Sequence, residues 1–278
     1  MEADYRNIRI MGILNITDDS FYEESRLLRV DGTLDEIALR YKIRQMLLSG
    51  VDIIDVGACS TRPGSKGVGA DAEWARLSAA LPVIKEEAPK TLISIDTYHA
   101  SVVEKVYSLI GTFMVNDISA GRMDKKMLGA VGQRGLPYIA MHMRGTPETM
   151  AGLTDYKDGI VNEVKNFFMD FAFKADAAGI KDWYLDPGFG FAKTISQNYT
   201  LMQHLDILQE LLRPIVVGIS RKSMIYNLLG QTPDDVLAPT QALHMVALER
   251  GASILRVHDV GAARHTLVLY KKLTDNDL

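Results

Sequence analysis

The sequence predicts an α/β fold, a single (β/α)8 barrel spanning residues 1–278, with long flexible loops after its first two strands. Three observations favour it. Eight short apolar runs alternate with segments of helical periodicity, the runs stop at polar or ionisable residues, and no linker or change in composition divides the chain. Parallel strands buried on both faces have such unbroken apolar runs, and a strand–helix repeat of about 30 residues fits eight units closed into one barrel.

The apolar runs are the predicted strands, and the first two lead into polar loops at Thr17–Arg26 and Cys59–Gly69. In chain order the strands are Ile8–Asn15, Val51–Gly57, Leu92–Asp96, Phe113–Asp117, Pro137–His142, Trp183–Asp186, Pro214–Ser220 and Ile254–His258. A doubly wound parallel sheet is the alternative architecture. It would place a G-x-G-x-x-G turn after the first strand, where this chain has the polar loop instead.

The predicted helices lie between the strands and repeat their apolar residues every three to four positions. Gly50 follows the first of them, at the position of a helix C-cap. The segments are Leu34–Ser49, Ala70–Glu87, Ala100–Leu109, Lys125–Arg134, Lys157–Ala178, Ser196–Leu212, Thr240–Arg250 and Ala262–Leu273. One more helix is expected to begin around Met224.

Composition and charge exclude several classes of protein. The chain is 47% apolar and 24% charged, with a formal net charge of −4, so it has ample material for a core and no basic field for nucleic acid. Cys59 is the only cysteine, which rules out an internal disulfide and a Cys-rich zinc site. The sequence has no apolar signal core at its start and no run long enough to cross a membrane, so we expect a cytoplasmic protein.

Three strand-end residues, Asp96, Asn116 and Asp186, predict a site that reads a flat heterocycle. A carboxylate accepts two parallel N–H bonds, and an amide both donates and accepts, which suits an aminopyrimidinone ring. The alternative for each residue singly is a cap on the loop that follows its strand. The carboxyl ends of barrel strands meet at one mouth, so the three side chains are expected to lie together.

A second, cationic group comes from the last strand. Arg256 and His258 are two residues apart, so their side chains should point to the same side, toward the mouth. Burial of an arginine there favours phosphate or pyrophosphate as its partner. The alternative is an internal salt bridge to an aspartate at a neighbouring strand end.

A third group surrounds Lys222. This lysine follows a strand through small and polar residues, so it can point into the mouth and bond a carbonyl or ring nitrogen; a solvated helix start is the alternative. The turn at Asp186–Phe191 contains Pro and two glycines, which allow close approach to a flat ligand. Phe191 and Met143 are candidates for contact with that ligand, whereas Phe189 is expected in the core.

These residues resemble one family, dihydropteroate synthase of folate biosynthesis. The resemblance covers nearly the whole chain in the family's order. It is carried by Met11–Phe21, Asp55–Gly57, Ser60–Gly64, Asp96–Thr97, Asn116–Asp117, Met141–Pro147, Asp186–Phe191, Ser220–Ser223 and Arg256–Asp259. It implies a pterin-binding TIM barrel, a transferase that joins 6-hydroxymethyl-7,8-dihydropterin pyrophosphate to p-aminobenzoate and releases pyrophosphate. The family is a sulfonamide target and is commonly homodimeric.

The resemblance also implies roles for individual residues. Catalysis is assigned to Asp96, Lys222, Arg256 and Asn15. The pterin is assigned to Asp96, Asn116, Asp186, Lys222, Met143 and Phe191. The pyrophosphate is assigned to Asn15, Arg62, Arg256 and His258, with Mg²⁺ held through Asn15 as the only cofactor. The p-aminobenzoate is assigned to Thr61, Arg62, Pro63, Lys222 and Ser223. The implied mechanism is a dissociative substitution, in which pyrophosphate leaves before the aromatic amine attacks.

The chain departs from the family pattern in its first two loops, with Asp18, Glu23, Ala58 and Cys59 at positions where the family usually has other residues. These changes leave the pterin residues in place and affect loop closure, and hence rate. Two further interpretations compete. A pterin-binding methyltransferase shares the acidic residues but needs no pyrophosphate clamp, and a catalytically silent homologue would bind pterin without turnover.

Overall fold

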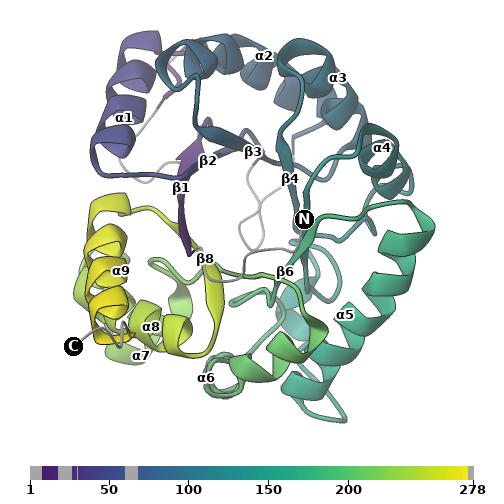
Figure 1. Ribbon diagram of the computed structural model, residues 1–278, viewed down its shortest axis with the longest axis vertical. Helices are drawn as coiled ribbons and strands as arrows, with labels where there is room; N and C mark the ends of the chain where they lie inside the picture. Colours follow the sequence, from purple (N-terminus) through teal and green to yellow (C-terminus); the bar gives the residue numbers. More distant parts are fainter. Residues whose placement is uncertain (1–7, 18–26, 30, 60–67, 275–278) are drawn as a thin grey trace.

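Eight parallel strands close into a barrel, and helices surround it (Figure 1). The computed structural model describes residues 8–17, 27–29, 31–59 and 68–274. Each strand pairs with the next along the chain, and the last closes on the first through Arg9↔Ile254 and Gly12↔Val257. The predicted (β/α)8 architecture is confirmed. The long loops predicted after the first two strands include residues 18–26 and 60–67, which lie outside the described residues.

All eight predicted strands are present, although the seventh is shorter than predicted. The strands are β1 (Arg9–Asn15), β2 (Ile53–Gly57), β3 (Leu92–Asp96), β4 (Met114–Asp117), β5 (Tyr138–Met141), β6 (Trp183–Asp186), β7 (Ile215–Val217) and β8 (Ala252–Val257). β7 pairs with β6 only at Leu185↔Ile215, and its register with β8 shifts between Ile215 and Val216. β8 ends at Val257, so His258 lies one residue beyond the strand in which it was predicted.

The helices follow the predicted segments to within three residues at each end, apart from Ser196–Leu212. They are α1 (Glu36–Leu48), α2 (Ala70–Glu87), α3 (Ala100–Ile110), α4 (Met127–Arg134), α5 (Ile160–Ala177), α6 (Ile195–Gln203), α7 (Ser223–Leu229), α8 (Leu237–Glu249) and α9 (Val260–Thr274), with 3-10 turns η2 (Met150–Gly152) and η3 (Leu205–Leu211).

The prediction of one continuous helix over Ser196–Leu212 is wrong. α6 ends at Gln203, His204 leaves helical geometry, and η3 continues as tighter 3-10 turns up to Leu212, whose φ is 53°. Leu205 and Leu208 are buried in the main core, three residues apart as a 3-10 helix requires, which explains why the apolar spacing resembled an α-helix. α8 begins at Leu237 rather than Thr240, because proline is tolerated in a first helical turn, where its missing N–H has no partner to lose.

Two helix starts show why the chain folds locally as it does. Asp35 precedes α1, and its carboxylate accepts a hydrogen bond from the Ala38 N–H at 3.0 Å. Thr194 and Gln197 form a reciprocal capping box at the start of α6. Each satisfies backbone donors that a helix start leaves without partners, a contribution of about 1 kcal/mol.

Alternation along the strands sorts the core into two layers. Outward residues such as Ile54, Ile95 and Leu255 belong to the large core between the strands and the helices. Inward residues such as Ile53 and Met114 fill the barrel interior in a separate cluster. That inward cluster comprises Met11, Ile53, Met114, Ile139, Tyr184, Val216 and Ile254. Because side chains alternate with period two, the residue two positions further along each strand also points inward, at the carboxyl end.

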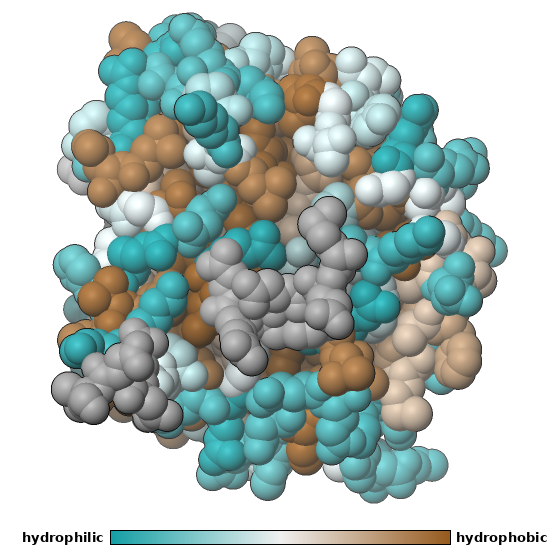
Figure 2. Space-filling model, in the orientation of Figure 1, coloured by the Kyte–Doolittle hydropathy of each residue, from teal (hydrophilic) through white to brown (hydrophobic). Residues whose placement is uncertain are grey.

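On the face shown in Figure 2, hydrophobic and hydrophilic side chains are interspersed over the helices. Among the described residues, no helix combines the length and the apolar character needed to cross a membrane.

Candidate active site

The inward positions at the carboxyl ends of the strands carry the predicted site residues. Each of these residues lies two positions beyond an inward residue of its strand. For Asp96 on β3 that inward residue is the polar Ser94, and for the others it belongs to the inward apolar cluster. They are Asn116 on β4, Asp186 on β6 and Arg256 on β8. The corresponding position after β7 is Gly218, which was not predicted as a site residue and leaves space for neighbouring side chains. Backbone pairing of Gly57 with Asp96 and of Asp96 with Asn116 puts adjacent strand ends at one level. The structure therefore brings the predicted acids and amide to one mouth.

Arg256 is ion-paired with two aspartates. Its Nε donates to Asp55 Oδ2 at 2.7 Å, and its Nη2 donates to Asp96 Oδ2 at 2.7 Å. The salt bridge that the sequence left as an alternative to an anion site is thus present. It does not use up the guanidinium, because five N–H donors are available and these two bonds occupy two of them.

Asp55 lies one level below Asp96, because β2 pairs Asp55 with Ser94 and Gly57 with Asp96, and its Oδ1 has no hydrogen-bond partner among the described residues. It is fully buried on β2, and its Oδ2 also accepts a hydrogen bond from Asn116 Nδ2 at 3.2 Å. One carboxylate therefore orients both the arginine and the amide. The sequence placed Asp55 only in a motif and assigned it no role. Its position two residues before the end of β2 could have indicated that its side chain faces the barrel interior.

The three pterin candidates each keep an acceptor oxygen without a partner among the described residues. Asp96 Oδ2 accepts from Arg256, and Asp186 Oδ1 accepts from the Gly188 N–H at 2.8 Å. Asn116 donates through Nδ2 to Asp55. The remaining atoms are Asp96 Oδ1, Asp186 Oδ2 and Asn116 Oδ1. Acceptors at a buried site favour a ligand edge rich in N–H groups.

Lys222 adds a donor to this set. Its Nζ donates to Phe189 O at 2.6 Å and lies 4.9 Å from the centre of the Phe191 ring. A Cβ added at Gly218 would lie 3.9 Å from both Lys222 Nζ and the Arg256 side chain, so the two cations flank the same glycine. The ammonium has further N–H groups for a ligand carbonyl. The solvated helix start considered for Lys222 is therefore not what the structure contains.

Burial shifts the pKa values of these groups in opposite directions. Burial, and then the Asp55, Glu73 and Asp117 charges, raise the pKa of Asp96 against the opposing effect of Arg256. Burial likewise raises the pKa of Asp186, and it lowers the pKa of Lys222 to about 8. Burial opposes the charge of Arg256, but Asp55 and Asp96 outweigh it and raise the pKa of that guanidinium. Such perturbed groups in one cleft are typical of a functional site.

Apolar side chains line one side of the mouth. Met143 is fully buried in a small cluster against which Phe191 and Tyr98 pack. The Met143 carbonyl accepts a hydrogen bond from Arg122 Nη2, which holds the loop after β5. A flat ligand contacted by a thioether and an aromatic ring is consistent with this arrangement. Phe189 is fully buried in the main core, as predicted.

Further predicted residues and their neighbours lie at the ends of β7 and β8. His258 is exposed, and its Nδ1 lies 3.2 Å from the hydroxyl of the buried Ser220. Arg221 has a φ of 54° and pairs with Asp259 through two bonds of 2.9 and 2.7 Å and with Asp234 at 2.7 Å. Ser223 is the first residue of α7. Arg221 therefore serves the loop, whereas Lys222 serves the mouth.

Asn15, the predicted metal ligand, ends β1 at the same level. A Cβ added at Gly57 would lie 3.2 Å from Asn15 Oδ1 and 3.6 Å from Asp96 Cβ, so the amide borders the acid site. Its side chain has no hydrogen bond to another described residue. In the described part of the chain, no group of three or more His, Cys, Asp and Glu could hold a metal ion. One free amide oxygen fits Mg²⁺ that takes its other ligands from water and a substrate phosphate.

Several predicted residues cannot be placed. Thr61, Arg62 and Pro63, with Asp18 and Glu23, lie outside the described residues. Of the other two departures from the family pattern, Ala58 is fully buried, and Cys59 has its Sγ 3.3 Å from the Tyr98 hydroxyl.

Lys193 is a buried lysine that the sequence did not predict as a site residue. Its Nζ lies 2.9 Å from His142 Nδ1 and donates to Gly188 O at 2.9 Å and Phe191 O at 3.0 Å. Burial, followed by the charge of Lys193, lowers the pKa of His142 to about 2. The only sequence signal was a lysine shortly after a Gly-rich turn, a position usually taken as exposed.

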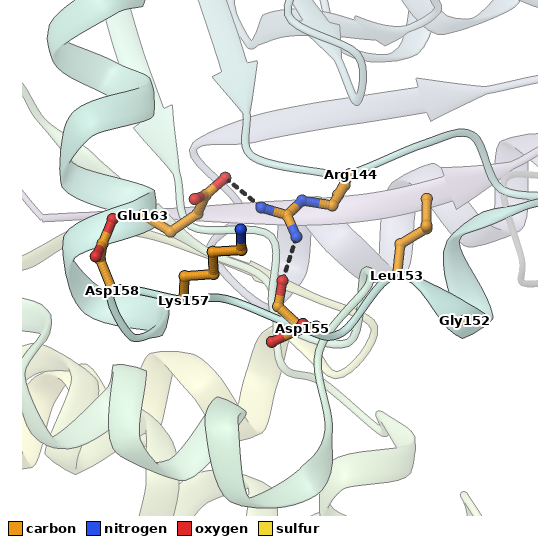
Figure 3. A pocket seen from close by; sticks show the side chains of 7 residues that line it. All are labelled: Arg144, Gly152, Leu153, Asp155, Lys157, Asp158 and Glu163. Carbon is orange, nitrogen blue, oxygen red and sulfur yellow. Dashed lines mark hydrogen bonds and ion pairs between the residues drawn. The ribbon is translucent and has the colours of Figure 1, made fainter.

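A separate cavity of about 440 Å³ lies beside the loop after β5 (Figure 3). Its lining residues are Arg144, Gly152, Leu153, Asp155, Lys157, Asp158 and Glu163. Arg144 extends between Glu163 and the backbone of Asp155, and it also stacks on Tyr156 at 4.2 Å. Of the predicted site residues that the structure describes, none lines this cavity.

The comparisons with known proteins agree with this geometry. Residues 11–258 match the family model described as pterin binding enzyme. A dihydropteroate synthase of Synechocystis is 38% identical over 256 residues, covering 91% of this chain and 86% of that protein, and one of Escherichia coli is 36% identical, covering 92% and 88%. This chain belongs to the dihydropteroate synthase family.

Solved structures of dihydropteroate synthases superpose closely on the chain. The Clostridium difficile enzyme, determined in the presence of pteroic acid, has a TM-score of 0.87 and 34% identity, covering 99% of each chain. The Thermus thermophilus enzyme in complex with 4-aminobenzoate has a TM-score of 0.83 and 34% identity, covering 97% of this chain and 96% of that one. A dihydropteroate synthase is a transferase, so the prediction of an enzyme of this class is confirmed.

Proposed function

We propose that this chain joins 6-hydroxymethyl-7,8-dihydropterin pyrophosphate to p-aminobenzoate, giving 7,8-dihydropteroate and pyrophosphate. The observation that carries the proposal is the convergence of three open acceptors, one lysine donor and one incompletely bonded arginine at the mouth of one barrel. Such a set is complementary to a pterin with an anionic leaving group.

The edge of the pterin ring carries the N–H donors that the three open acceptor oxygens need. A dihydropterin has an amino group and ring N–H groups, together with a carbonyl oxygen. Asp96, Asn116 and Asp186 accept from the N–H groups, and Lys222 donates to the carbonyl. Recognition of this kind is selective, because an analogue without those groups would leave buried carboxylates unpaired.

The leaving group belongs on the cationic side. Arg256 has three N–H donors beyond those bonded to Asp55 and Asp96, and His258 lies at the adjacent β8 end. Donors already held in place before charge develops stabilise a departing anion without reorganisation. The two aspartates keep the guanidinium oriented, so it meets the pyrophosphate in a fixed position.

Mg²⁺ fits at Asn15, where it would neutralise pyrophosphate charge. The amide oxygen of Asn15 would be one protein ligand at the edge of the acid site, and substrate phosphates and water would supply the others. The metal requirement is part of the proposal.

The reaction is a dissociative substitution. The C–O bond to pyrophosphate breaks first and leaves a cation delocalised over the electron-rich dihydropterin; the amine of p-aminobenzoate then forms the C–N bond and loses a proton. Asp96, which borders the ring, stabilises the positive charge that develops on it. Neither a covalent enzyme intermediate nor a strong base is needed.

The p-aminobenzoate position rests on the predicted Thr61, Arg62, Pro63 and Ser223 together with Lys222. The Thermus thermophilus relative binds 4-aminobenzoate, and the Yersinia pestis relative has been solved with a sulfonamide drug. We extend that binding to this chain. A homodimer and a cytoplasmic location are likewise predictions.

One assay tests the function. The purified protein is mixed with the pterin pyrophosphate and Mg²⁺, and pyrophosphate release is followed with and without p-aminobenzoate. Release that requires p-aminobenzoate and stops on removal of Mg²⁺ with a chelator is expected. Pterin binding without release would instead identify a silent homologue.

A further inference from the structure

The turn between β6 and α6 forms one wall of the proposed pterin site, and its backbone conformation is demanding. Gly188, Gly190 and Ala192 all have positive φ, of 69°, 83° and 51°. A Cβ added at Gly188 would lie 2.0 Å from the carbonyl oxygen of His142, so the turn packs directly against the end of β5. Such a conformation needs specific partners to hold it.

Lys193 provides partners for carbonyls on both sides of Phe189. Its Nζ donates to Gly188 O at 2.9 Å and to Phe191 O at 3.0 Å. The Phe189 carbonyl between them accepts from Lys222 at 2.6 Å. The turn is thus tied by two lysines, one buried beneath it and one in the mouth.

The third bond of Lys193 joins the turn to the neighbouring strand. Its Nζ lies 2.9 Å from His142 Nδ1 and 3.4 Å from the His142 carbonyl oxygen, and the protonated amine donates to both. The backbone of β5 is fastened at the same place, where the His142 N–H donates to Asp186 O at 2.9 Å. Lys193 therefore links the end of β5, the turn and, through Phe189, the mouth lysine.

We propose, on the basis of the function proposed above, that Lys193 is a positioning residue of the pterin site: its buried ammonium holds the β6–α6 turn in the shape that aims Lys222 and Asp186 at one ligand. It touches no reacting atom. The proposed mechanism makes no use of Lys193, yet a polar amine would be costly to bury for packing alone.

Charge gives Lys193 a second way to act. The positive charge of Lys193 is one of those that lower the pKa of Asp186, together with Lys222 and Arg256, against the larger raising effect of burial. Burial lowers the pKa of Lys193 well below its usual value; Asp186 and Glu163 of α5 oppose this effect, and Lys222 and Arg122 of the loop after β4 add to it. Removal of the Lys193 charge should therefore raise the pH at which Asp186 becomes protonated and pterin binding is lost.

The experiment measures binding by calorimetry with two probes, 6-hydroxymethylpterin and Mg²⁺ pyrophosphate. For Lys193→Met, we expect the pterin Kd to rise at least 10-fold and the pyrophosphate Kd to change less than 2-fold. Lys174→Met removes an exposed lysine of α5 and should leave both values unchanged. A pterin Kd within 2-fold of the wild type, or equal weakening of both probes, would overturn the proposal.

The pH dependence separates positioning from general damage. The acidic midpoint of pterin binding should move upward in Lys193→Met and stay at the wild-type value in Lys193→Arg, which keeps the charge. Equal midpoints in both variants would reject the electrostatic part. If Lys193→Met does not fold, Lys193→Gln replaces it, with a pterin Kd raised at least 3-fold expected and an unchanged Kd contradicting the proposal.

This test is distinct from that of the proposed function. The proposed function fails if the wild type binds pterin but releases no pyrophosphate, whereas the Lys193 proposal fails on the variant's pterin Kd even when the wild type turns over.

Discussion

Asn116 and Asp117 are neighbours at the end of β4, and they differ in how completely their hydrogen bonds are satisfied. Asp117 faces outward and accepts four hydrogen bonds: from the Ser119 N–H and hydroxyl at 2.7 Å each, from the Gly121 N–H at 2.8 Å and from the Tyr138 hydroxyl at 2.6 Å. Asn116 faces inward, and its Oδ1 has no partner among the described residues. Both are buried.

The contrast shows how function differs from structure at a strand end. A buried polar group with all its bonds made inside the protein stabilises the fold, and one with an open bond is available to a ligand. Asp96 and Asp186 resemble Asn116 in this respect, since each keeps one oxygen open. The inward group is therefore assigned to substrate and the outward one to stability.

The largest effect is expected where the inward group carries charge. Replacement of Asp96 or Arg256 with alanine should lower kcat by about 100-fold or more, if each contributes about 3 kcal/mol to the transition state. Removal of Arg256 also leaves Asp55 and Asp96 facing one another without their cation. Steady-state pyrophosphate release measures the effect, and circular dichroism checks that the variants are folded. Near-normal turnover in both would reject the assignment.

Replacement of Asp117, the outward aspartate, should lower stability and leave pterin binding nearly unchanged. Asp117→Asn replaces an acceptor oxygen with a donor and leaves some of the four hydrogen bonds unmade, so the free energy of unfolding should fall by about 3 kcal/mol. Urea denaturation measures this loss. The Kd for 6-hydroxymethylpterin should change by less than about 3-fold at a temperature where the variant is folded. A selective loss of pterin binding would contradict the contrast between the two positions.

Asn116→Ala tests the inward amide directly. It removes one ligand acceptor and one donor to Asp55, so pterin should bind about 10-fold more weakly, in line with the loss of one buried hydrogen bond. Calorimetry with 6-hydroxymethylpterin gives the value. A smaller effect than that of Asp117→Asn would show that the open oxygen of Asn116 does not face the ligand.

A pH profile of kcat/KM tests whether the inward ionisable groups act on the substrate. Lys222 has a pKa of about 8, so activity should fall as pH rises through 8 and the ammonium loses its proton. On the acidic side, activity should fall as Asp96 and Asp186 become protonated, above the usual carboxylate range because burial raises the pKa of each. Lys222→Arg, whose pKa lies far higher, should remove the alkaline fall; an unchanged alkaline limb would exclude Lys222 as its cause.

The smallest effect on activity is expected at the metal position. Asn15→Ala removes one amide ligand but leaves phosphate and water ligands, so the Mg²⁺ concentration for half-maximal activity should rise by about 5-fold. Titration of pyrophosphate release with Mg²⁺ gives this value. The same midpoint in the variant and the wild type would place the ion elsewhere.

Much of the fold could be predicted from the sequence because local patterns determine it. The apolar runs of β1 to β6 and β8 and the helical spacing around α2 or α5 are properties of neighbouring residues. The error at Ser196–Leu212 arose because Leu205 and Leu208 have a spacing that suits α- and 3-10 helices alike. Only the packing of η3 against the core decides between them.

From the sequence, the site could be predicted only for residues whose position at a strand end determines where their side chains point. Asp96, Asn116 and Asp186 were found because apolar strands end there, and Arg256 because its place two residues before His258 on the last strand indicated a side chain facing the mouth. The bond from Arg256 to Asp55 joins residues 201 positions apart, and that from Lys193 to His142 joins residues 51 apart. No local sequence pattern contains such contacts, so the roles of Asp55 and Lys193 could be assigned only from the closed barrel.

The most direct test of the central claim is a crystal structure of the protein with 6-hydroxymethylpterin and Mg²⁺ pyrophosphate. The account predicts pterin N–H groups within hydrogen-bond distance of Asp96 Oδ1, Asn116 Oδ1 and Asp186 Oδ2, with the pyrophosphate on Arg256. A pterin bound elsewhere, with those three oxygens still open, would contradict it.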